Sequence, residues 1–305
     1  MGGILITSFE RPLYTIKRFS GTTYQITKFK ICGQSIHIKD DEVTENDSKL
    51  DNAFSRARSM VYQYGMCNPW DYFATLTLDK EKYNRFDLFK YKKDLGQFIR
   101  DLRKKYPDNE NRISFLFVPE NHKDGAWHIH GLINGLPNCE VKRFEGKCYP
   151  KYLTENEFYN WESYQRKFGF VSLAKIRNHE ATINYTTKYI NKDIKALRDL
   201  KGEHLYMASR PLKKAEHVAD VYAHQRELDE CITEHYRFCS VGRFKTNDWT
   251  WPYQYSEDME PFSPSQIVKL QKPVLEVDPV TIDVSSQLKI KEMENLGNVW
   301  NYKRV

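Results

Sequence analysis

Two histidines, His128 and His130, stand two residues apart in the run Trp127-His-Ile-His-Gly-Leu-Ile. The run predicts a strand, and alternate side chains on a strand point to the same face. Two convergent imidazoles supply half of a divalent-metal site. The alternative is a pair of exposed or hydrogen-bonded strand histidines without a metal.

Glu120 is the candidate third ligand, and its direction depends on the hairpin that precedes the histidines. The run 113–118 predicts a strand that turns back into the histidine strand. A three-residue turn at 123–125, with its glycine in the left-handed conformation, places Glu120 opposite His128 and on the same face. A two-residue loop would pair Glu120 with Ile129 and direct it to the other face. The sequence leaves both registers open.

A predicted helix further along carries the pattern Y-x-x-K-Y-x-x-K. At about 100° per residue, Tyr185, Lys188, Tyr189 and Lys192 cluster in a narrow sector, and aliphatic residues fall on the opposite side. A phenol can attack phosphate and form a covalent phosphotyrosine. Its pKa of about 10 requires a nearby cation, and lysine can lower that pKa and hold the phosphodiester. The alternative is a polar helix face whose tyrosines pack beneath a neighbouring loop.

The two groups of residues favour one chemistry when they are taken together. A metal polarises a phosphate oxygen while a phenol attacks phosphorus. Neither group needs the other for folding. Their occurrence in one chain favours an enzyme that nicks DNA.

The elements that must position these residues follow the order β–α–β–β–insertion–β–α. A strand at 72–78 precedes a helix of roughly 20 residues, then come the hairpin, an insertion at 134–165, a strand at 170–176 and the tyrosine helix. We predict that Asn178 caps the last helix, which runs to about Leu200. The apolar face of the first helix comprises Leu88, Tyr91, Leu95, Phe98, Ile99 and Leu102.

This order predicts an α+β fold, with an antiparallel sheet and helices on one face. We divide the chain into an N-terminal β-rich segment at 1–44, a catalytic domain at 45–212 and an irregular C-terminal accessory region at 213–305.

Composition excludes several classes of protein. The 305 residues include 47 Lys and Arg against 41 Asp and Glu, a formal net charge of +6, and the 40% of hydrophobic residues is ordinary for a folded chain. No apolar run approaches about 18 residues, so no membrane span is expected, and without a visible signal peptide we expect a cytoplasmic protein. The six cysteines form no C-x-x-C pair, so we expect free thiols rather than a zinc ribbon.

Three stretches, in this order, resemble the motifs of rolling-circle replication initiators of the HUH endonuclease superfamily. Phe73-Ala-Thr-Leu-Thr-Leu-Asp resembles the first motif, a hydrophobic strand with paired threonines. Glu120 with Trp127-His-Ile-His-Gly-Leu resembles the metal motif. Tyr185-Thr-Thr-Lys-Tyr-Ile-Asn-Lys resembles the nucleophile motif in its two-tyrosine form. The chain is most similar to the phage and bacterial group related to the filamentous-phage gene II protein, over about residues 45–212.

The resemblance implies a ferredoxin-like or RRM-like sheet, a bound Mg²⁺ or Mn²⁺, and site-specific nicking of an origin strand. The products would be a 5′-phosphotyrosine link and a free 3′-OH that primes synthesis. The residues carried over by position are Glu120, His128 and His130 as metal ligands, Tyr185 and Tyr189 as nucleophiles, and Lys188 and Lys192 as phosphate-assisting groups. The order in which the two tyrosines act stays open.

The implied partners are single-stranded or origin DNA, a host polymerase and a separate helicase. A separate helicase is required because no G-x-x-x-x-G-K-[ST] motif occurs in the chain. The sequence does not indicate an oligomeric state, or whether the element is a phage, a plasmid or an integrated copy.

Two alternatives remain from the sequence. The first is a single-strand transposase or a mobilisation relaxase, although relaxases usually place the tyrosine before a three-histidine cluster and such transposases are usually shorter. The second is a non-enzymatic nucleic-acid-binding protein on the same sheet, which would have no need of the tyrosine pair.

Overall fold

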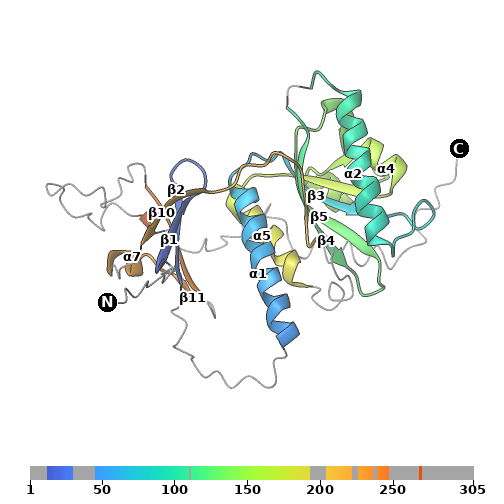
Figure 1. Ribbon diagram of the computed structural model, residues 1–305. Helices are drawn as coiled ribbons and strands as arrows, with labels where there is room; N and C mark the ends of the chain where they lie inside the picture. Colours follow the sequence, from blue (N-terminus) through green and yellow to red (C-terminus); the bar gives the residue numbers. More distant parts are fainter. Residues whose placement is uncertain are drawn as a thin grey trace, which may run out of the picture. The chain divides into compact units, whose positions relative to one another are not determined.

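The computed structural model describes residues 12–29, 45–109, 111–192, 204–221, 226–235, 239–246 and 268–269. For residues 45–52, 191–192 and 268–269 it describes the backbone alone. The chain divides into two units, each with its own sheet (Figure 1). The larger unit takes its described residues from Leu50–Gly65 and Pro69–Leu212, and the smaller from Met1–Lys49, Met66–Asn68 and Lys213–Val274.

The larger unit is built on a seven-stranded sheet in which every neighbouring pair is antiparallel. In sheet order its strands are β6 (Val141–Arg143), β7 (Tyr159–Trp161), β8 (Val171–Lys175), β3 (Tyr72–Thr77), β5 (Trp127–Asn134), β4 (Ser114–Asn121) and β9 (Met207–Ala208). The insertion after β5 contains η1 (Asn138–Glu140), α3 (Lys151–Glu155) and α4 (Glu162–Lys167) as well as β6 and β7.

The four central strands belong to two β-α-β crossovers that overlap in the sheet. Helix α2 (Leu88–Lys105) connects β3 to β4, and the insertion with α4 connects β5 to β8, while the spatial order is β8-β3-β5-β4. Each crossover therefore skips over one strand of the other crossover, as in a split β-α-β arrangement. The predicted α+β class and the antiparallel sheet are confirmed.

Helices α2 and α4 cover one face of this sheet and form its main core. The side chain of Asp87 caps α2 by accepting a hydrogen bond from the backbone N–H of Lys90. The buried residues of α2 are the six that the sequence predicts: Leu88, Tyr91, Leu95, Phe98, Ile99 and Leu102. They pack with Tyr164 and Phe168 from the α4 segment against the apolar side of β3 and β5.

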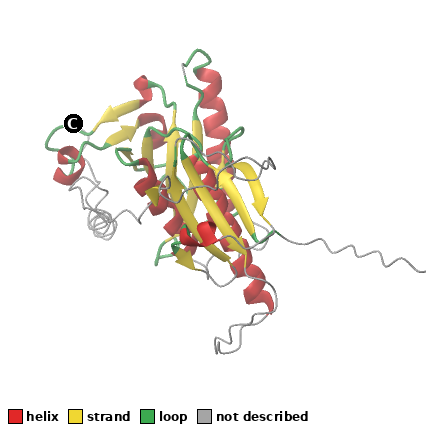
Figure 2. Ribbon diagram, turned by 90° about the vertical axis from the view of Figure 1, so that its left-hand side faces the viewer, coloured by secondary structure: helices red, strands yellow, loops and turns green. Residues whose placement is uncertain are grey.

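The opposite face of the sheet is also covered by a helix, in addition to the single helical layer that the sequence predicts. In Figure 1, α5 is labelled on the other side of the strands from α2 and α4, and Figure 2 gives the view turned by 90°. Helix α5 (His179–Lys192) packs on β4 and β5 there. As predicted, Asn178 caps it, accepting a hydrogen bond from the backbone N–H of Ala181 at 3.0 Å. The predicted extension toward Leu200 lies outside the described residues.

Helix α1 (Glu45–Met66) lies against α5. A Cβ placed on Gly65 would lie 2.7 Å from a side-chain carbon of Ile183, so a larger residue here would require Ile183 or the helices to shift. The indole N–H of Trp70 donates to the carbonyl of Gly65 at 2.9 Å and fixes the chain between α1 and β3.

The smaller unit joins strands from both ends of the chain in one sheet. Its elements are β1 (Tyr14–Arg18), β2 (Thr23–Phe29), β10 (Glu216–Val221), α7 (Arg226–Glu230), β11 (Glu234–His235), β12 (Cys239–Lys245) and β13 (Val268–Lys269). Strand β1 pairs with β10, and β2 pairs with β12. The apolar core includes Tyr14, Ile16, Ile26 and Phe244, all fully buried.

The sequence predicts no membrane-spanning helix and free thiols, and the described residues bear on both expectations. No helix there is both long and apolar enough to span a bilayer. Five of the cysteines are described, and all five are free thiols: Cys67, Cys139, Cys148, Cys231 and Cys239.

Candidate metal and tyrosine site

The β4–β5 hairpin has the register that directs Glu120 toward the histidines. Glu120 lies opposite His128 in the ladder. The turn is closed by the backbone N–H of His122, which donates to Ala126 at 2.9 Å, and by that of Gly125, which donates to His122 at 2.8 Å. Gly125 has a φ of +84°, the left-handed conformation that the three-residue turn requires. The two-residue alternative is excluded.

Glu120, His128 and His130 share one buried face of the sheet. Their exposed fractions are 5%, 3% and 4%. An Oε atom of Glu120 lies 2.7 Å from Nε2 of His130. Carboxylates and imidazoles are rarely buried this deeply unless they are paired or hold a ligand.

Two threonines of β3 orient the two imidazoles. Thr75 lies opposite His130 and Thr77 lies opposite His128 in the β3–β5 ladder. The hydroxyl of Thr75 is hydrogen-bonded to Nδ1 of His130 at 3.3 Å, and that of Thr77 to Nδ1 of His128 at 3.0 Å. With both Nδ1 atoms engaged, Nε2 is the nitrogen that each ring offers to a ligand. This contact gives the paired threonines of the first motif a physical role.

The geometry fits a divalent cation. Nε2 of His130 is buried and, among the described groups, has no hydrogen-bond partner, although the Glu120 carboxylate lies at contact distance. An orphaned buried nitrogen is rare in folded proteins. Ligand atoms of Glu120, His122 and His130 all lie within 4.8 Å of one another, so this group contains two of the three predicted ligands and has His122 where the sequence predicts His128. This buried group can bind a metal ion.

His122 is a site residue that the sequence analysis missed, because Glu120 was the only residue before the turn that it considered as a ligand. It follows Glu120 by two positions, and its ring stacks on His128 with centroids 3.6 Å apart and an interplanar angle of 5°. The signal was available: Glu120 and His122 stand at the i, i+2 spacing that places strand residues on one face.

Burial keeps the imidazole of His128 neutral. Desolvation lowers the pKa of His128 well below its usual value, and the neighbouring His122 and His130 lower it further. The charge of Arg85 also lowers the pKa of His128. The backbone carbonyl of Arg85 accepts a hydrogen bond from the backbone N–H of Trp127 at 2.9 Å. A neutral imidazole is the form that coordinates a metal.

The glycine after the second histidine is required by the close approach of two strands. A Cβ on Gly131 would lie 2.0 Å from the carbonyl oxygen of Leu116 on β4. No side chain can occupy that position without separating β4 from β5. The glycine therefore maintains the pairing that aligns Glu120 with the histidines.

The tyrosine face of α5 packs onto the histidine face of the sheet and is largely withdrawn from solvent. Tyr189 is 2% exposed, and its ring stacks on His130 with centroids 4.2 Å apart and an angle of 10°. The ring of Tyr185 makes an edge contact with Phe73 at 5.5 Å. The hydroxyl of Tyr189 donates a hydrogen bond to that of Tyr185. The sequence placed Tyr189 on the helix face opposite the aliphatic residues. In the structure Tyr189 is buried between α5 and the sheet.

The structure describes the side chain of one lysine of the motif and only the backbone of the other. Lys188 is exposed, and its Nζ lies 6.0 Å from the ring centroid of Tyr185. The side chain of Lys192 lies outside the described residues. Burial raises the pKa of Tyr185 to about 12, the charge of Glu120 also raises it, and the hydrogen bond from Tyr189 lowers it. The phenol of Tyr185 is therefore protonated at neutral pH unless a cation is added nearby.

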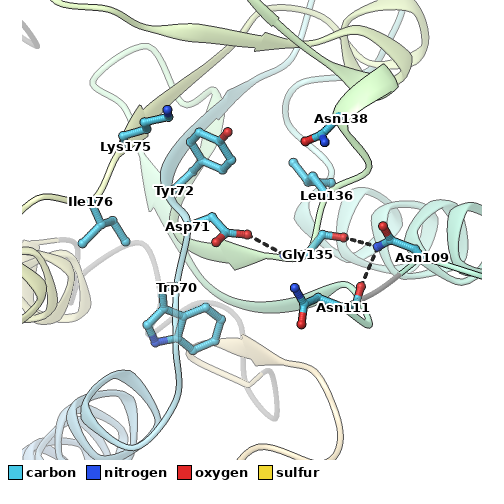
Figure 3. A pocket seen from close by; sticks show the side chains of 10 residues that line it. All are labelled: Trp70, Asp71, Tyr72, Asn109, Asn111, Gly135, Leu136, Asn138, Lys175 and Ile176. Carbon is cyan, nitrogen blue, oxygen red and sulfur yellow. Dashed lines mark hydrogen bonds between the residues drawn. The ribbon is translucent and has the colours of Figure 1, made fainter.

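A pocket of about 450 Å³ lies at the other end of β3 (Figure 3). Its lining includes Asp71 and Asn109, which both hydrogen-bond to the backbone of Gly135, at 2.7 Å in each case. Tyr72 in this pocket and Thr77 at the site are five residues apart, roughly 16 Å along a strand. The pocket contains none of the residues that the sequence predicts as metal ligands or nucleophiles.

Residues 71–194 match the family described as Replication-associated protein ORF2/G2P. No curated protein and no solved structure matches the chain. The matched range runs from the start of β3 through the hairpin to the end of the described part of α5, and it contains every residue of the predicted site. Over residues 71–194, the chain is therefore similar to replication-associated proteins of the ORF2/G2P family.

Proposed function

We propose that this chain initiates rolling-circle DNA replication as a metal-dependent, site-specific endonuclease and strand transferase. One observation carries the proposal: the tyrosine pair of α5 lies directly on the Glu-His face, with the ring of Tyr189 stacked on His130. The phenols and the metal ligands therefore lie on the same face of the sheet, as a site that uses both on one DNA phosphate requires. The family match over the same residues supports the assignment.

Glu120, His128 and His130 are the residues that would hold Mg²⁺ or Mn²⁺. When bound, such a cation supplies Lewis-acid polarisation of a phosphate oxygen. Two imidazoles and one carboxylate accept several divalent ions, so the donor set alone does not select between the two metals.

Tyr185 is our candidate for the first attack. Its oxygen accepts the hydrogen bond of Tyr189, which favours the phenolate, and it is less buried than Tyr189. The Tyr185 oxygen forms a bond to phosphorus as the bond from phosphorus to the 3′ oxygen breaks. The phenol loses its proton and the departing 3′ oxygen gains one, which leaves a 5′-phosphotyrosine and a free 3′-OH.

Tyr189 and the two lysines complete the proposed machinery. Tyr189 would perform a second transfer, in which the roles of donor and acceptor hydroxyl are exchanged. Lys188 and Lys192 would bind the phosphate; Lys188 is exposed beside Tyr185 and free to move toward DNA.

The proposed partners are single-stranded origin DNA, a host polymerase that extends the 3′-OH, and a separate helicase. Because the sequence lacks a G-x-x-x-x-G-K-[ST] motif, unwinding would be supplied by another protein. We place the activity in the cytoplasm, where these partners act.

Incubation of the full chain with single-stranded origin oligonucleotides and Mn²⁺ tests this function. We expect a covalent protein–DNA adduct that chelation of the metal prevents. The Tyr185→Phe, Tyr189→Phe double variant should form none, whereas Tyr149→Phe, which retains its ring contact with Phe144, should behave as the wild type. Binding of DNA with no cleavage under any metal condition would contradict the proposal and favour a non-enzymatic binding protein.

A further inference from the structure

The sequence motif uses one residue of β4 as a metal ligand, but the structure brings a second potential ligand to the same place. His122 follows Glu120 by two positions, and its side chain is 12% exposed. We infer that His122 is an additional metal ligand, which acts together with Glu120 and His130. This inference deepens the proposed function and rests on its metal site.

The distances are those that one cation can bridge. Nε2 of His122 lies 3.8 Å from Glu120 Oε2, and the ligand atoms of Glu120, His122 and His130 are all within 4.8 Å of one another. Ligands that bind one ion at about 2.1–2.2 Å lie about 3 Å apart across a right angle and about 4.3 Å apart across the ion. The three groups therefore need to move by only a fraction of an ångström to ligate one cation.

The hairpin holds His122 in this position from both sides. Its backbone N–H donates to Ala126, and its carbonyl accepts from Gly125, so the main chain is fixed where β4 ends. Its ring lies flat on His128 at 3.6 Å. A ligand whose backbone and ring are both fixed loses little conformational freedom on binding a metal.

The additional imidazole changes which metal the site prefers. Glu120, His122 and His130 supply two nitrogens and one carboxylate, and removal of His122 leaves only one of these nitrogens beside the carboxylate. Mg²⁺ favours oxygen ligands and retains its water, while Mn²⁺ and the later divalent metals accept imidazole more readily. The site should therefore bind Mn²⁺ in preference to Mg²⁺, and His122 should contribute to that preference.

Titration of the full chain with Mn²⁺, followed by electron paramagnetic resonance, measures this contribution. We expect His122→Ala to raise the Kd for Mn²⁺ by about tenfold or more and to reduce the preference over Mg²⁺. Pulsed resonance of the bound Mn²⁺ should detect one fewer coordinated nitrogen. The control is His204→Ala, which removes an exposed histidine of the same unit.

A second variant separates ligation from support of the neighbouring ring. His122→Phe can still stack on His128 but offers no nitrogen, so it should lose the same affinity as His122→Ala. Wild-type Mn²⁺ affinity and nitrogen count in either variant would overturn the inference. Circular dichroism of each variant identifies any loss of fold.

The covalent-adduct assay at saturating Mn²⁺ distinguishes failure of the His122 inference from failure of the proposed nicking function. Adduct formation in the wild type, together with unchanged Mn²⁺ binding in His122→Phe, would remove His122 from the site and leave the function standing. Loss of Mn²⁺ binding in His122→Phe without any adduct in the wild type would support the metal site and contradict the nicking function.

Discussion

The same two strands, β3 and β5, present opposite chemistry on their two faces. Toward α2 and α4 they direct Ala74, Leu76 and Ile129, all of them fully buried among apolar neighbours. Toward α5 they direct threonine hydroxyls and the imidazoles of His128 and His130, which are almost as deeply buried. The side chains of His130 and Ile129 are one residue apart in sequence and lie on opposite sides of the sheet.

This difference shows which face is built for stability and which for chemistry. Apolar burial stabilises the fold by about 25 cal/mol per Å². Buried polar groups cost free energy unless they are hydrogen-bonded, and the Nε2 atom of His130 faces the Glu120 carboxylate at 2.7 Å without hydrogen-bond geometry. Substitutions of neighbouring residues on the two faces should therefore affect different measurements.

The largest contrast should come from His130→Gln and Ile129→Ala. We expect His130→Gln to weaken Mn²⁺ binding at least about a hundredfold, because it removes the nitrogen nearest Glu120. Ile129→Ala should lower the free energy of unfolding by about 2–5 kcal/mol while leaving Mn²⁺ affinity nearly unchanged under conditions where the chain is folded. Isothermal titration and denaturant unfolding measure the two quantities. Equal effects of both variants on both quantities would remove the distinction between the faces.

The threonines of β3 should have the next largest effect on the metal. Thr75→Val and Thr77→Val remove the hydroxyls bonded to Nδ1 of the two histidines but keep the shape of the side chain. We expect each to reduce Mn²⁺ affinity about 10- to 100-fold. The matched controls Thr75→Ser and Thr77→Ser retain the hydroxyl and should stay near the wild type. Equal losses in the serine and valine variants would show that packing, rather than the hydrogen bond, is responsible.

Lysines on the two helical layers provide a comparison of intermediate size. Lys188 on α5 is exposed beside Tyr185, and Lys104 is exposed on α2, on the other side of the sheet. We expect Lys188→Ala to slow adduct formation about tenfold, because it removes a positive charge that would bind the DNA phosphate. Lys104→Ala should leave the rate unchanged. Timed quenching of the oligonucleotide reaction gives both rates, and a similar rate for the two variants would count against a role for Lys188.

The smallest effect should be the dependence of stability on pH in the metal-free protein. Burial holds the pKa of His128 below that of an unfolded histidine, which is about 6.5. Between those two pKa values the unfolded chain binds more protons, so the free energy of unfolding rises with pH, by at most about 1.4 kcal/mol per pH unit for one group. His128→Gln should flatten this rise between pH 5 and 7. An unchanged slope in the variant would assign the dependence to other groups.

Local patterns predicted much of the larger unit. The helical spacing of apolar residues identified all six buried positions of α2, from Leu88 to Leu102. Turn chemistry allowed two hairpin registers, and the three-residue form with Gly125 in the left-handed conformation is the one observed. These features depend on residues close together in the chain, where spacing and backbone geometry decide the outcome.

Long-range packing decided the features that the sequence did not show. The burial of Tyr189 depends on α5 crossing the sheet over His130, which helical periodicity alone cannot predict. The stacking of His122 on His128 depends on where the turn ends. The pairing of β1 with β10 joins residues about 200 positions apart, so two terminal regions that the sequence treats separately share one sheet.

Mass spectrometry of the DNA-linked peptide, after reaction of the full chain with origin oligonucleotide and Mn²⁺, tests the central claim most directly. The account predicts that the DNA phosphate is attached to a tyrosine of α5, Tyr185 in the first transfer, and that chelation of the metal abolishes the adduct. Attachment to a residue outside α5, or cleavage with no protein-bound DNA, would contradict the account.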